Sequence, residues 1–275
     1  NKLIIQIIIF SITLLCLNIT KSFANQSLNW FTSAGSYKSE RFFQSSEINK
    51  FNINELEKFW IFNSGSTDKF DTVQSAPIFI DGQLIFVTLS AELISISPIS
   101  GKIIWKKKLN SPLGRRGLTF YESESPKHNG IYIASGNKIL QIDLKGNIVS
   151  EFSSGLSLLQ PIIHEDILYV ATLKNGVKSF DLKTKQQIWH TPLSKNGVSP
   201  RVWSGFSFDE DTKTVFIVTS NPGGVIGENR SGDDFSVSLI AISAENGQIK
   251  WHHKHIKNDV WDFDLISNPL IIKNL

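Results

Sequence analysis

Two aspartates near the end of the chain are spaced so that they could share one chemical task. Asp262 and Asp264 are two residues apart, and side chains at i and i+2 point to the same side of a strand. Two carboxylates held side by side are costly unless a cation lies between them. The pair therefore predicts a metal site with oxygen ligands. The alternative is a pair of solvated carboxylates in a turn.

Three histidines nearby form a second candidate cluster. His252, His253 and His255 directly follow Trp251, on a segment that we expect to be a strand. We expect surface or packing roles for them rather than a zinc site.

The elements that would position these side chains are short strands. Runs rich in Ile, Val, Phe and Thr are broken by Gly, Asn, Asp or Pro, as in residues 77–87 and 166–171. This pattern is typical of a strand, a tight turn and a second strand. After the first residues only one short helix is expected, over Ile53–Phe59, with Asn52 as its N-cap.

One unit recurs along the chain, in which an apolar strand, a turn and a second strand lead to a Trp. Copies cover residues 93–105, 179–189 and 239–251, and a weaker copy without the Trp covers 140–148. Intervals of about 40–45 residues with a few short strands each are typical of β-propeller blades. We therefore expect an all-β propeller with about four to five blades over residues 25–275, in which each repeat Trp packs between neighbouring sheets.

The last interval between repeats is longer than the others. It implies an insertion of about 20 residues, around Asn221 to Phe235. Such insertions lie on one face of a propeller, where ligand sites are built.

Composition narrows the function classes. The chain has 275 residues, is 41% hydrophobic and 19% charged, and has a net charge of +3, which indicates a globular protein rather than a disordered one. The charge forms no basic stripe, so we do not expect nucleic acid as a partner. Cys16 is the only cysteine and lies in the segment described next, so the mature chain would have no thiol chemistry.

The start of the chain resembles an export signal. Lys2 precedes an apolar run over residues 3–17, and Ser22-Phe23-Ala24 follows. We interpret residues 1–24 as a secretory signal peptide and expect a periplasmic protein. A membrane anchor is the alternative, because the apolar run is nearly long enough to span a bilayer. The chain stops directly after an apolar run, which we interpret as the sign of a fragment.

Four segments carry a resemblance to one family. They are residues 30–65, residues 114–120, Asn221-Pro222 followed by residues 230–242, and residues 258–264, where the sequence is Asn-Asp-Val-Trp-Asp-Phe-Asp. They resemble, in the correct order, the pyrroloquinoline-quinone (PQQ) dehydrogenases, eight-bladed propellers that oxidise alcohols and sugars. The resemblance covers roughly residues 30–272 and the first half of a family member. Non-catalytic propellers, such as the outer-membrane assembly lipoprotein, share the blade repeat, so a protein-binding scaffold is the alternative.

The resemblance implies a cofactor site. PQQ is anionic and planar, and it needs cations, a flat aromatic partner and a metal ion. Arg116 matches the family arginine that pairs with an oxygen of PQQ, and Trp203 matches the tryptophan on which PQQ lies. The alternatives are a surface arginine and another packing tryptophan.

The resemblance also implies the metal and the base. Asn221 matches a metal ligand, although an Asn before Pro222 is also typical of a turn. Asp262 matches the catalytic base, which in the family also touches the metal, and Asp264 matches a second carboxylate ligand. The expected ion is calcium or a lanthanide, the substrate is an alcohol, polyol or sugar, and the electron acceptor is a quinone or a cytochrome c.

The chain departs from the family pattern in three places. A family glutamate that binds the metal is missing, since residues 170–177 contain no acid and carry Lys174 instead. Gln74 stands where a glutamate is frequent. The adjacent cysteines of methanol-oxidising members are absent, which favours the glucose-type branch. The missing glutamate leaves a degenerate, inactive member as a further alternative.

Overall fold

The computed structural model describes residues 29–43, 45, 47–65, 74–88, 90–111, 113–194, 199–222 and 234–273. The expected signal peptide, residues 1–24, and the motif residues 230–233 lie outside these ranges. Within them, no helix combines the length and the apolar character that crossing a bilayer requires.

The described residues form four sheets, each of four antiparallel strands in chain order. The first sheet contains β1 (Ile78–Ile80), β2 (Gln83–Val87), β3 (Glu92–Ile96) and β4 (Ile103–Lys108). The second contains β5 (Thr119–Tyr121), β6 (Gly130–Ser135), β7 (Lys138–Ile142) and β8 (Ile148–Ser153). The third contains β9 (Ile162–His164), β10 (Ile167–Thr172), β11 (Gly176–Asp181) and β12 (Gln187–Thr191). The fourth contains β13 (Gly205–Asp209), β14 (Thr214–Val218), β15 (Ser238–Ser243) and β16 (Ile249–Lys254).

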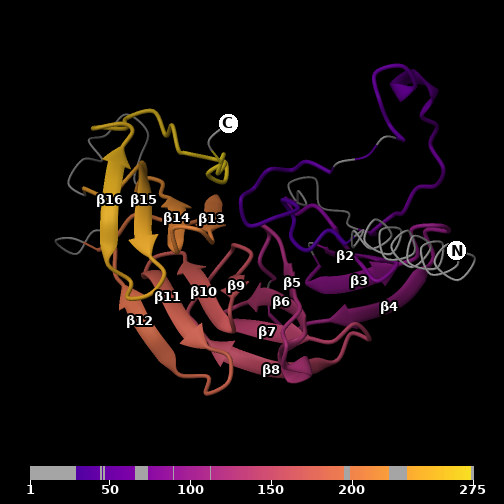
Figure 1. The fold of residues 1–275 in the computed structure, drawn as a ribbon, viewed down its shortest axis with the longest axis horizontal. Helices are drawn as coiled ribbons and strands as arrows, with labels where there is room; N and C mark the ends of the chain where they lie inside the picture. The colour runs from indigo at the N-terminus through magenta and orange to yellow at the C-terminus, as the bar shows by residue number, and fades with distance from the viewer. Residues whose placement is uncertain are drawn as a thin grey trace, which may run out of the picture.

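The sheets fan out around a common axis, with β5, β9 and β13 toward the centre and β4, β8, β12 and β16 at the outside (Figure 1). This arrangement confirms the expected all-β propeller, and the four sheets agree with the lower end of the expected blade number. Each sequence repeat corresponds to the third and fourth strands of one sheet and the turn between them.

The hydrophobic cores lie between neighbouring sheets. One cluster joins Ile78 and Ile85 of the first sheet to Ile131 and Ile133 of the second, and another joins the third and fourth sheets. Middle strands are covered on both faces, so β6 is buried at every position, whereas the outer strand β4 alternates between exposed and half-buried residues. The near-continuous apolar runs in the sequence follow from this burial on both faces.

A tryptophan lies on a turn glycine in three of the four sheets. Trp105 and Trp189 reach this glycine from the neighbouring sheet, and Trp60 reaches it from the chain before β1. A Cβ atom added at Gly101, Gly146 or Gly247 would lie 3.0, 2.9 or 2.7 Å from Trp60, Trp105 or Trp189, respectively. Each indole N–H also donates to a carbonyl of the same turn, those of Pro98, Leu144 and Ala244, at 2.7–2.9 Å. Trp105 and Trp189 therefore pack between sheets, as predicted, each on the turn glycine of the following sheet, whereas Trp251 in the last described sheet is 47% exposed.

The contact between the second and third sheets lacks both partners. In β8, Ser150 pairs with Gln141 at the position where Trp105 pairs with Ser95 in β4. In the following turn, Lys185 has the positive φ, 61°, that the glycines have elsewhere. A side chain fits at this turn because no indole lies against it. Lys185 instead places its ammonium 5.8 Å from the ring centre of Phe152.

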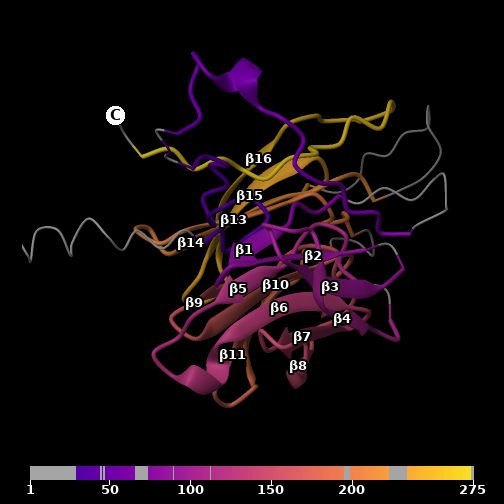
Figure 2. The ribbon, with the colours of Figure 1, turned by 90° about the vertical axis from the view of Figure 1, so that its right-hand side faces the viewer.

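A segment near the start of the chain crosses the inner strands of all four sheets. Trp30 bridges to Phe79 of β1, and Phe31 accepts from the backbone of β5. The hydroxyl of Tyr37 accepts a hydrogen bond from the backbone N–H of Ile163 in β9. The backbone carbonyl of Tyr37 accepts one from the N–H of Phe208 in β13. Ile271, near the other end, donates to Lys38, and Figure 2 shows both segments on the same side of the sheets. We call residues 30–41 the axial segment.

The predicted helix over Ile53–Phe59 is wrong in extent. The structure has only a three-residue 3₁₀ helix here, η1 (Ile53–Glu55), and Asn52 makes no side-chain cap to it; a second 3₁₀ helix, η2, covers Pro126–His128. The chain is extended from Leu56 onward, because Trp60 lies against the turn of the first sheet. That long-range contact overrides the local helical pattern.

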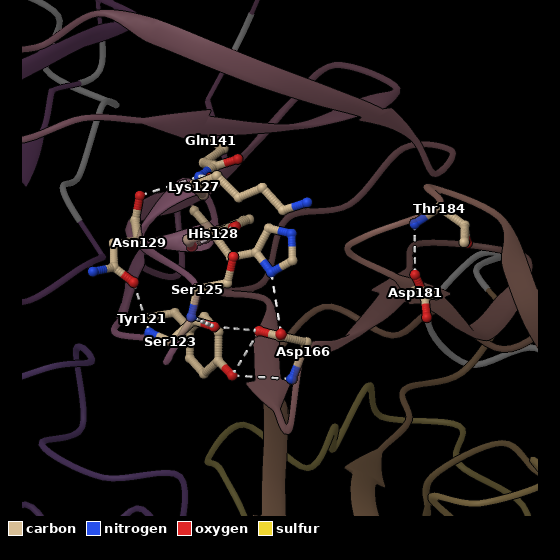
Figure 3. A network of polar contacts seen from close by, with 11 residues as sticks. Tyr121, Ser123, Ser125, Lys127, His128, Asn129, Gln141, Asp166, Asp181 and Thr184 are labelled. Carbon is tan, nitrogen blue, oxygen red and sulfur yellow. Dashed lines mark hydrogen bonds and ion pairs between the residues drawn. The ribbon is translucent and has the colours of Figure 1, made fainter.

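Polar contacts add a second link between the second and third sheets (Figure 3). The carboxylate of Asp166, in the β9–β10 turn, accepts from Ser123 at 2.7 Å and Tyr121 at 3.1 Å, and lies 3.1 Å from Nδ1 of His128. Partial burial opposes ionisation of Asp166, but the hydrogen bonds from Ser123, His128 and Tyr121 outweigh it and lower its pKa. The ionised form therefore stabilises the interface.

Replacing Gly247 by alanine tests the contact with Trp189. The left-handed φ of 75° costs about 1–2 kcal/mol for any Cβ, and the clash with the indole adds about 1–3 kcal/mol. Gly82→Ala is the matched control, because φ is 72° there and nothing lies within 4 Å of the added Cβ. In urea unfolding of the natural protein that carries this chain, Gly247→Ala should lose more stability than Gly82→Ala. Equal losses would contradict the tryptophan contact.

Replacing Asp166 by asparagine tests the polar link. A carboxylate with a lowered pKa contributes stability above its unfolded pKa of about 3.9 and loses it as the pH falls through the folded value. Since the Asp166 side chain is 38% exposed, we expect Asp166→Asn to cost only about 1 kcal/mol at pH 7. Unfolding midpoints measured between pH 7 and about pH 3 should converge with the wild type at the acidic end. Asp81→Asn, in an exposed turn, is the control, and a pH-independent loss in Asp166→Asn would contradict the assignment.

Candidate functional site

The candidate site lies where the inner strands begin. Trp203 precedes β13 and Asn221 follows β14. Because these strands pair antiparallel, the start of β13 lies beside the end of β14, and both residues lie at the same end of the fourth sheet. The long β14–β15 connection, expected as an insertion, starts at this end. A pocket of about 400 Å³ opens here, lined by Leu158, Leu173, Arg201, Trp203, Ser220, Asn221, Asp262 and Asp264.

Three carboxylates converge at this pocket. Oxygen atoms of Asp259, Asp262 and Asp264 all lie within 4.8 Å of one another. The side-chain amide of Asn221 donates to Asp262 at 2.6 Å, to Asp264 at 3.2 Å and to Asp259 at 3.3 Å. We call Asn221 and these aspartates the acid cluster.

A turn, and not a strand, brings the aspartates together. Asp259 is buried, and its carboxylate accepts the backbone N–H groups of Trp261 and Phe263 at 3.2 and 3.0 Å. Asp262 lies in the left-handed region with φ 68°. The predicted convergence of Asp262 and Asp264 is therefore correct, but the expected strand geometry is wrong. A non-glycine residue held in this strained region is common at functional sites.

The electrostatics of the cluster favour a bound cation. Burial raises the pKa of Asp264, and the neighbouring carboxylates of Asp262 and Asp259 raise it further, against hydrogen bonds from Asn221 and Trp203. A cation among these oxygens would reverse that effect, since it stabilises the ionised form. Carboxylate and amide oxygens are also the ligands that hard cations prefer. The residues thus fit a metal ion with oxygen ligands.

An aromatic ring and a guanidinium adjoin the cluster. The indole N–H of Trp203 donates to Asp264 at 3.2 Å, and the guanidinium carbon of Arg116 lies 4.5 Å from the centre of the indole ring system. The backbone of Arg116 is fixed by a bridge to Leu159, before β9. Burial lowers the pKa of the Arg116 guanidinium, because it disfavours the charged form. A neighbouring anion would stabilise that charged form. Arg116 and Trp203 together fit a planar anion.

The structure thus brings together all five residues singled out from the sequence: Arg116, Trp203, Asn221, Asp262 and Asp264. Asp259 was not assigned a role, although it belongs to the quoted motif, because its burial cannot be seen in the sequence. The β10–β11 hairpin brings Leu173 to the pocket, and it has no carboxylate where the family has its glutamate. Among the described residues, Asp259 is the third carboxylate of the cluster.

The histidines lie elsewhere, as expected. His252, His253 and His255 are exposed, on or next to β16. His252 packs edge-on against Phe235, with ring centres 5.2 Å apart. The only candidate metal cluster found among the described residues is that of the three aspartates.

Comparisons with known proteins show the family of the chain. Residues 30–158 and 192–274 match the family model for the glucose/ethanol/alcohol dehydrogenase β-propeller domain. The chain is 26% identical over 229 residues to quinoprotein alcohol dehydrogenase PedH of Pseudomonas putida, with 79% of this chain and 37% of that protein covered. It is 22% identical to quinate/shikimate dehydrogenase (quinone) of Acinetobacter baylyi, with 90% and 40% covered.

Solved structures show the same fold. Quinohemoprotein alcohol dehydrogenase from Comamonas testosteroni superposes with a TM-score of 0.72 at 18% identity, covering 91% of this chain and 44% of that one. Europium-containing methanol dehydrogenase gives a TM-score of 0.70 at 16% identity, covering 86% and 50%. The chain therefore spans half or less of the length of these relatives. It belongs to the PQQ-dependent glucose/ethanol/alcohol dehydrogenase family, as part of its β-propeller domain.

Proposed function

We propose that this chain is the part of a PQQ-dependent dehydrogenase that holds the metal ion and the general base, and that the enzyme oxidises an alcohol, polyol or sugar. The observation that carries the proposal is the acid cluster, three carboxylates and an amide gathered beside Trp203 and Arg116. A protein-binding scaffold has no need of carboxylates that converge in this way, and their mutual repulsion would cost it stability.

Asn221, Asp259, Asp262 and Asp264 would hold calcium or a lanthanide. Turning the Asn221 amide over would exchange its NH₂ group for its carbonyl oxygen, so that all four side chains present oxygen atoms to the ion. When bound, the metal would polarise the quinone carbonyl of PQQ, and PQQ would accept the hydride of the substrate. Arg116 and Trp203 would hold the planar, anionic cofactor, since a guanidinium pairs with carboxylate and quinone oxygens and an indole offers a flat face.

Asp262 would take the proton of the substrate hydroxyl. Its side chain is exposed, whereas Asp259 is buried and already accepts two backbone N–H groups. Asp264 is bound by both Asn221 and the indole of Trp203. Of the three carboxylates, Asp262 is therefore the one best placed to reach a substrate, and a general base must come within hydrogen-bond distance of the proton that it removes.

The cellular setting belongs to the same proposal. Export to the periplasm is proposed from the signal-peptide pattern of residues 1–24, and transfer of electrons to a quinone or a cytochrome c from the family resemblance.

Replacing Asp262 tests the base. The natural protein that carries this chain is titrated with PQQ in the presence of calcium or lanthanum, and reduction of a dye by alcohols and sugars is followed. We expect stoichiometric binding, and a loss of dye reduction in Asp262→Asn by about 10²–10⁴-fold that exceeds any loss of PQQ binding. Glu151→Gln, on exposed β8, should behave as the wild type. Absence of PQQ binding with either metal would instead favour the scaffold or the degenerate member.

Replacing Asp264 tests the metal ligands. A carboxylate attracts a trivalent ion more strongly than a divalent one by Coulomb's law. Asp264→Asn should therefore weaken lanthanum binding more than calcium binding, by about tenfold or more, which is about 1.4 kcal/mol. Competition between the two ions, followed by calorimetry, measures the difference. Equal losses for both ions would show that Asp264 does not contact the metal.

A further inference from the structure

The backbone of the turn at residues 259–263 is held mainly by one side chain. Asp259 is 4% exposed, and its Oδ1 atom accepts the backbone N–H groups of Trp261 and Phe263 at 3.2 and 3.0 Å. The side chains of Trp261 and Phe263 are 66% and 63% exposed, so packing does not fix them. No backbone–backbone hydrogen bond joins this turn to another part of the chain that the structure describes. Its conformation therefore depends on the buried carboxylate.

The β7–β8 turn has the same arrangement at a distance from the site. There Oδ1 of Asp143 accepts the N–H groups two and four residues later, those of Lys145 and Asn147, at 2.9 and 2.8 Å. The residue between these two is Gly146, which has a left-handed φ of 84°. Glycine adopts this conformation without strain. A turn capped in this way thus has a position that suits glycine, three residues after the aspartate.

Asp262 occupies that position in the turn of the acid cluster. Its φ of 68° is left-handed, which is unfavourable for a residue with a side chain. A return to an ordinary φ would rotate the next peptide and turn the N–H of Phe263 away from Asp259. The two hydrogen bonds to the carboxylate oppose this return, because charge-assisted bonds are about twice as strong as neutral ones.

The two oxygen atoms of Asp259 have different partners. Oδ1 accepts both backbone N–H groups, whereas Oδ2 accepts from Nδ2 of Asn221 at 3.3 Å and faces the cluster. The side chain can therefore hold the turn with one oxygen while the other remains on the side of the metal ligands.

We propose that Asp259 is a positioning residue, which keeps Asp262 in its left-handed conformation so that the Asp262 carboxylate faces the pocket before metal or cofactor binds. A reacting group that is misplaced by about 1 Å can cost about 10²-fold in rate, so a base in a preformed position favours turnover. The inference rests on the proposed function for the role of Asp262, but the way in which the turn is held does not depend on it.

Amide hydrogen exchange, followed by mass spectrometry without PQQ or metal on the natural protein that carries this chain, tests the turn. Asp259→Ala removes the acceptor, so exchange over residues 260–264 should become about tenfold faster or more. Asp259→Asn keeps an oxygen acceptor and should stay within about threefold of the wild type. Asp143→Ala is the matched control, which should speed exchange in its own turn and leave residues 260–264 unchanged.

Turnover per bound PQQ, measured at saturating PQQ and calcium, tests the consequence. Asp259→Ala should lower kcat by about 10²-fold with little change in KM, Asp259→Asn should restore most of it, and Asp143→Ala should match the wild type. A residue needed only for folding would lower the amount of PQQ bound and not kcat per bound PQQ. A residue needed only as a metal ligand would regain full kcat when the calcium concentration is raised.

Unchanged exchange in Asp259→Ala, or equal losses of kcat in Asp259→Ala and Asp259→Asn, would overturn the inference. If Asp259→Ala does not fold, Asp259→Leu replaces it, because leucine fills a similar space without an acceptor. Absence of PQQ binding in the wild type would overturn the proposed function instead, and the exchange rates would still decide whether Asp259 holds the turn.

Discussion

The packing of a tryptophan on a glycine of the next sheet sets the geometry on which the candidate site depends. A four-stranded sheet of this length has little core of its own, and its apolar residues are buried only against its neighbours. The indole fills the gap at the outer edge of the sheets, and its N–H satisfies a carbonyl of the turn that it covers. Packing at the outer edges leaves the inner strands to converge, and the loops before them meet around the axis (Figure 1).

Convergence of the inner strands brings side chains from different sheets together. The acid cluster is built from the end of the fourth sheet and the turn at residues 259–264. Arg116 comes from the residues before β5 in the second sheet, and its guanidinium lies against the ring of Trp203. The site therefore depends on contacts between sheets as well as on the turn that Asp259 caps.

The sequence predicted those features that depend on local pattern. The strand–turn–strand runs, the turn glycines and the repeat Trp can be recognised from the sequence alone. The third and fourth strands of each sheet were therefore located correctly. Family motifs then placed Arg116, Trp203, Asn221, Asp262 and Asp264, which the fold brings together. The family assignment is confirmed by the match to the propeller domain, whereas the roles of the five residues stay predictions.

Features that depend on long-range packing were not visible. The expected helix at Ile53–Phe59 has apolar spacing that suits a helix, but Trp60 is held by a turn some 40 residues later. The burial of Asp259 follows from its place under the turn that it caps. The left-handed conformation of Asp262 belongs to the same turn, and it has no signature in the sequence.

The pairing of tryptophan and glycine also constrains how such a chain can diverge. Each interface takes one partner from each of two successive repeats, so an exchange of a whole repeat between related genes splits two pairs at once. A substitution of the indole removes the constraint on a residue about 40 positions later, as Ser150 and Lys185 illustrate. Once a lysine has entered that turn, a tryptophan can no longer return to the preceding strand without a clash. Loss of the pair therefore takes one substitution, whereas its recovery takes two.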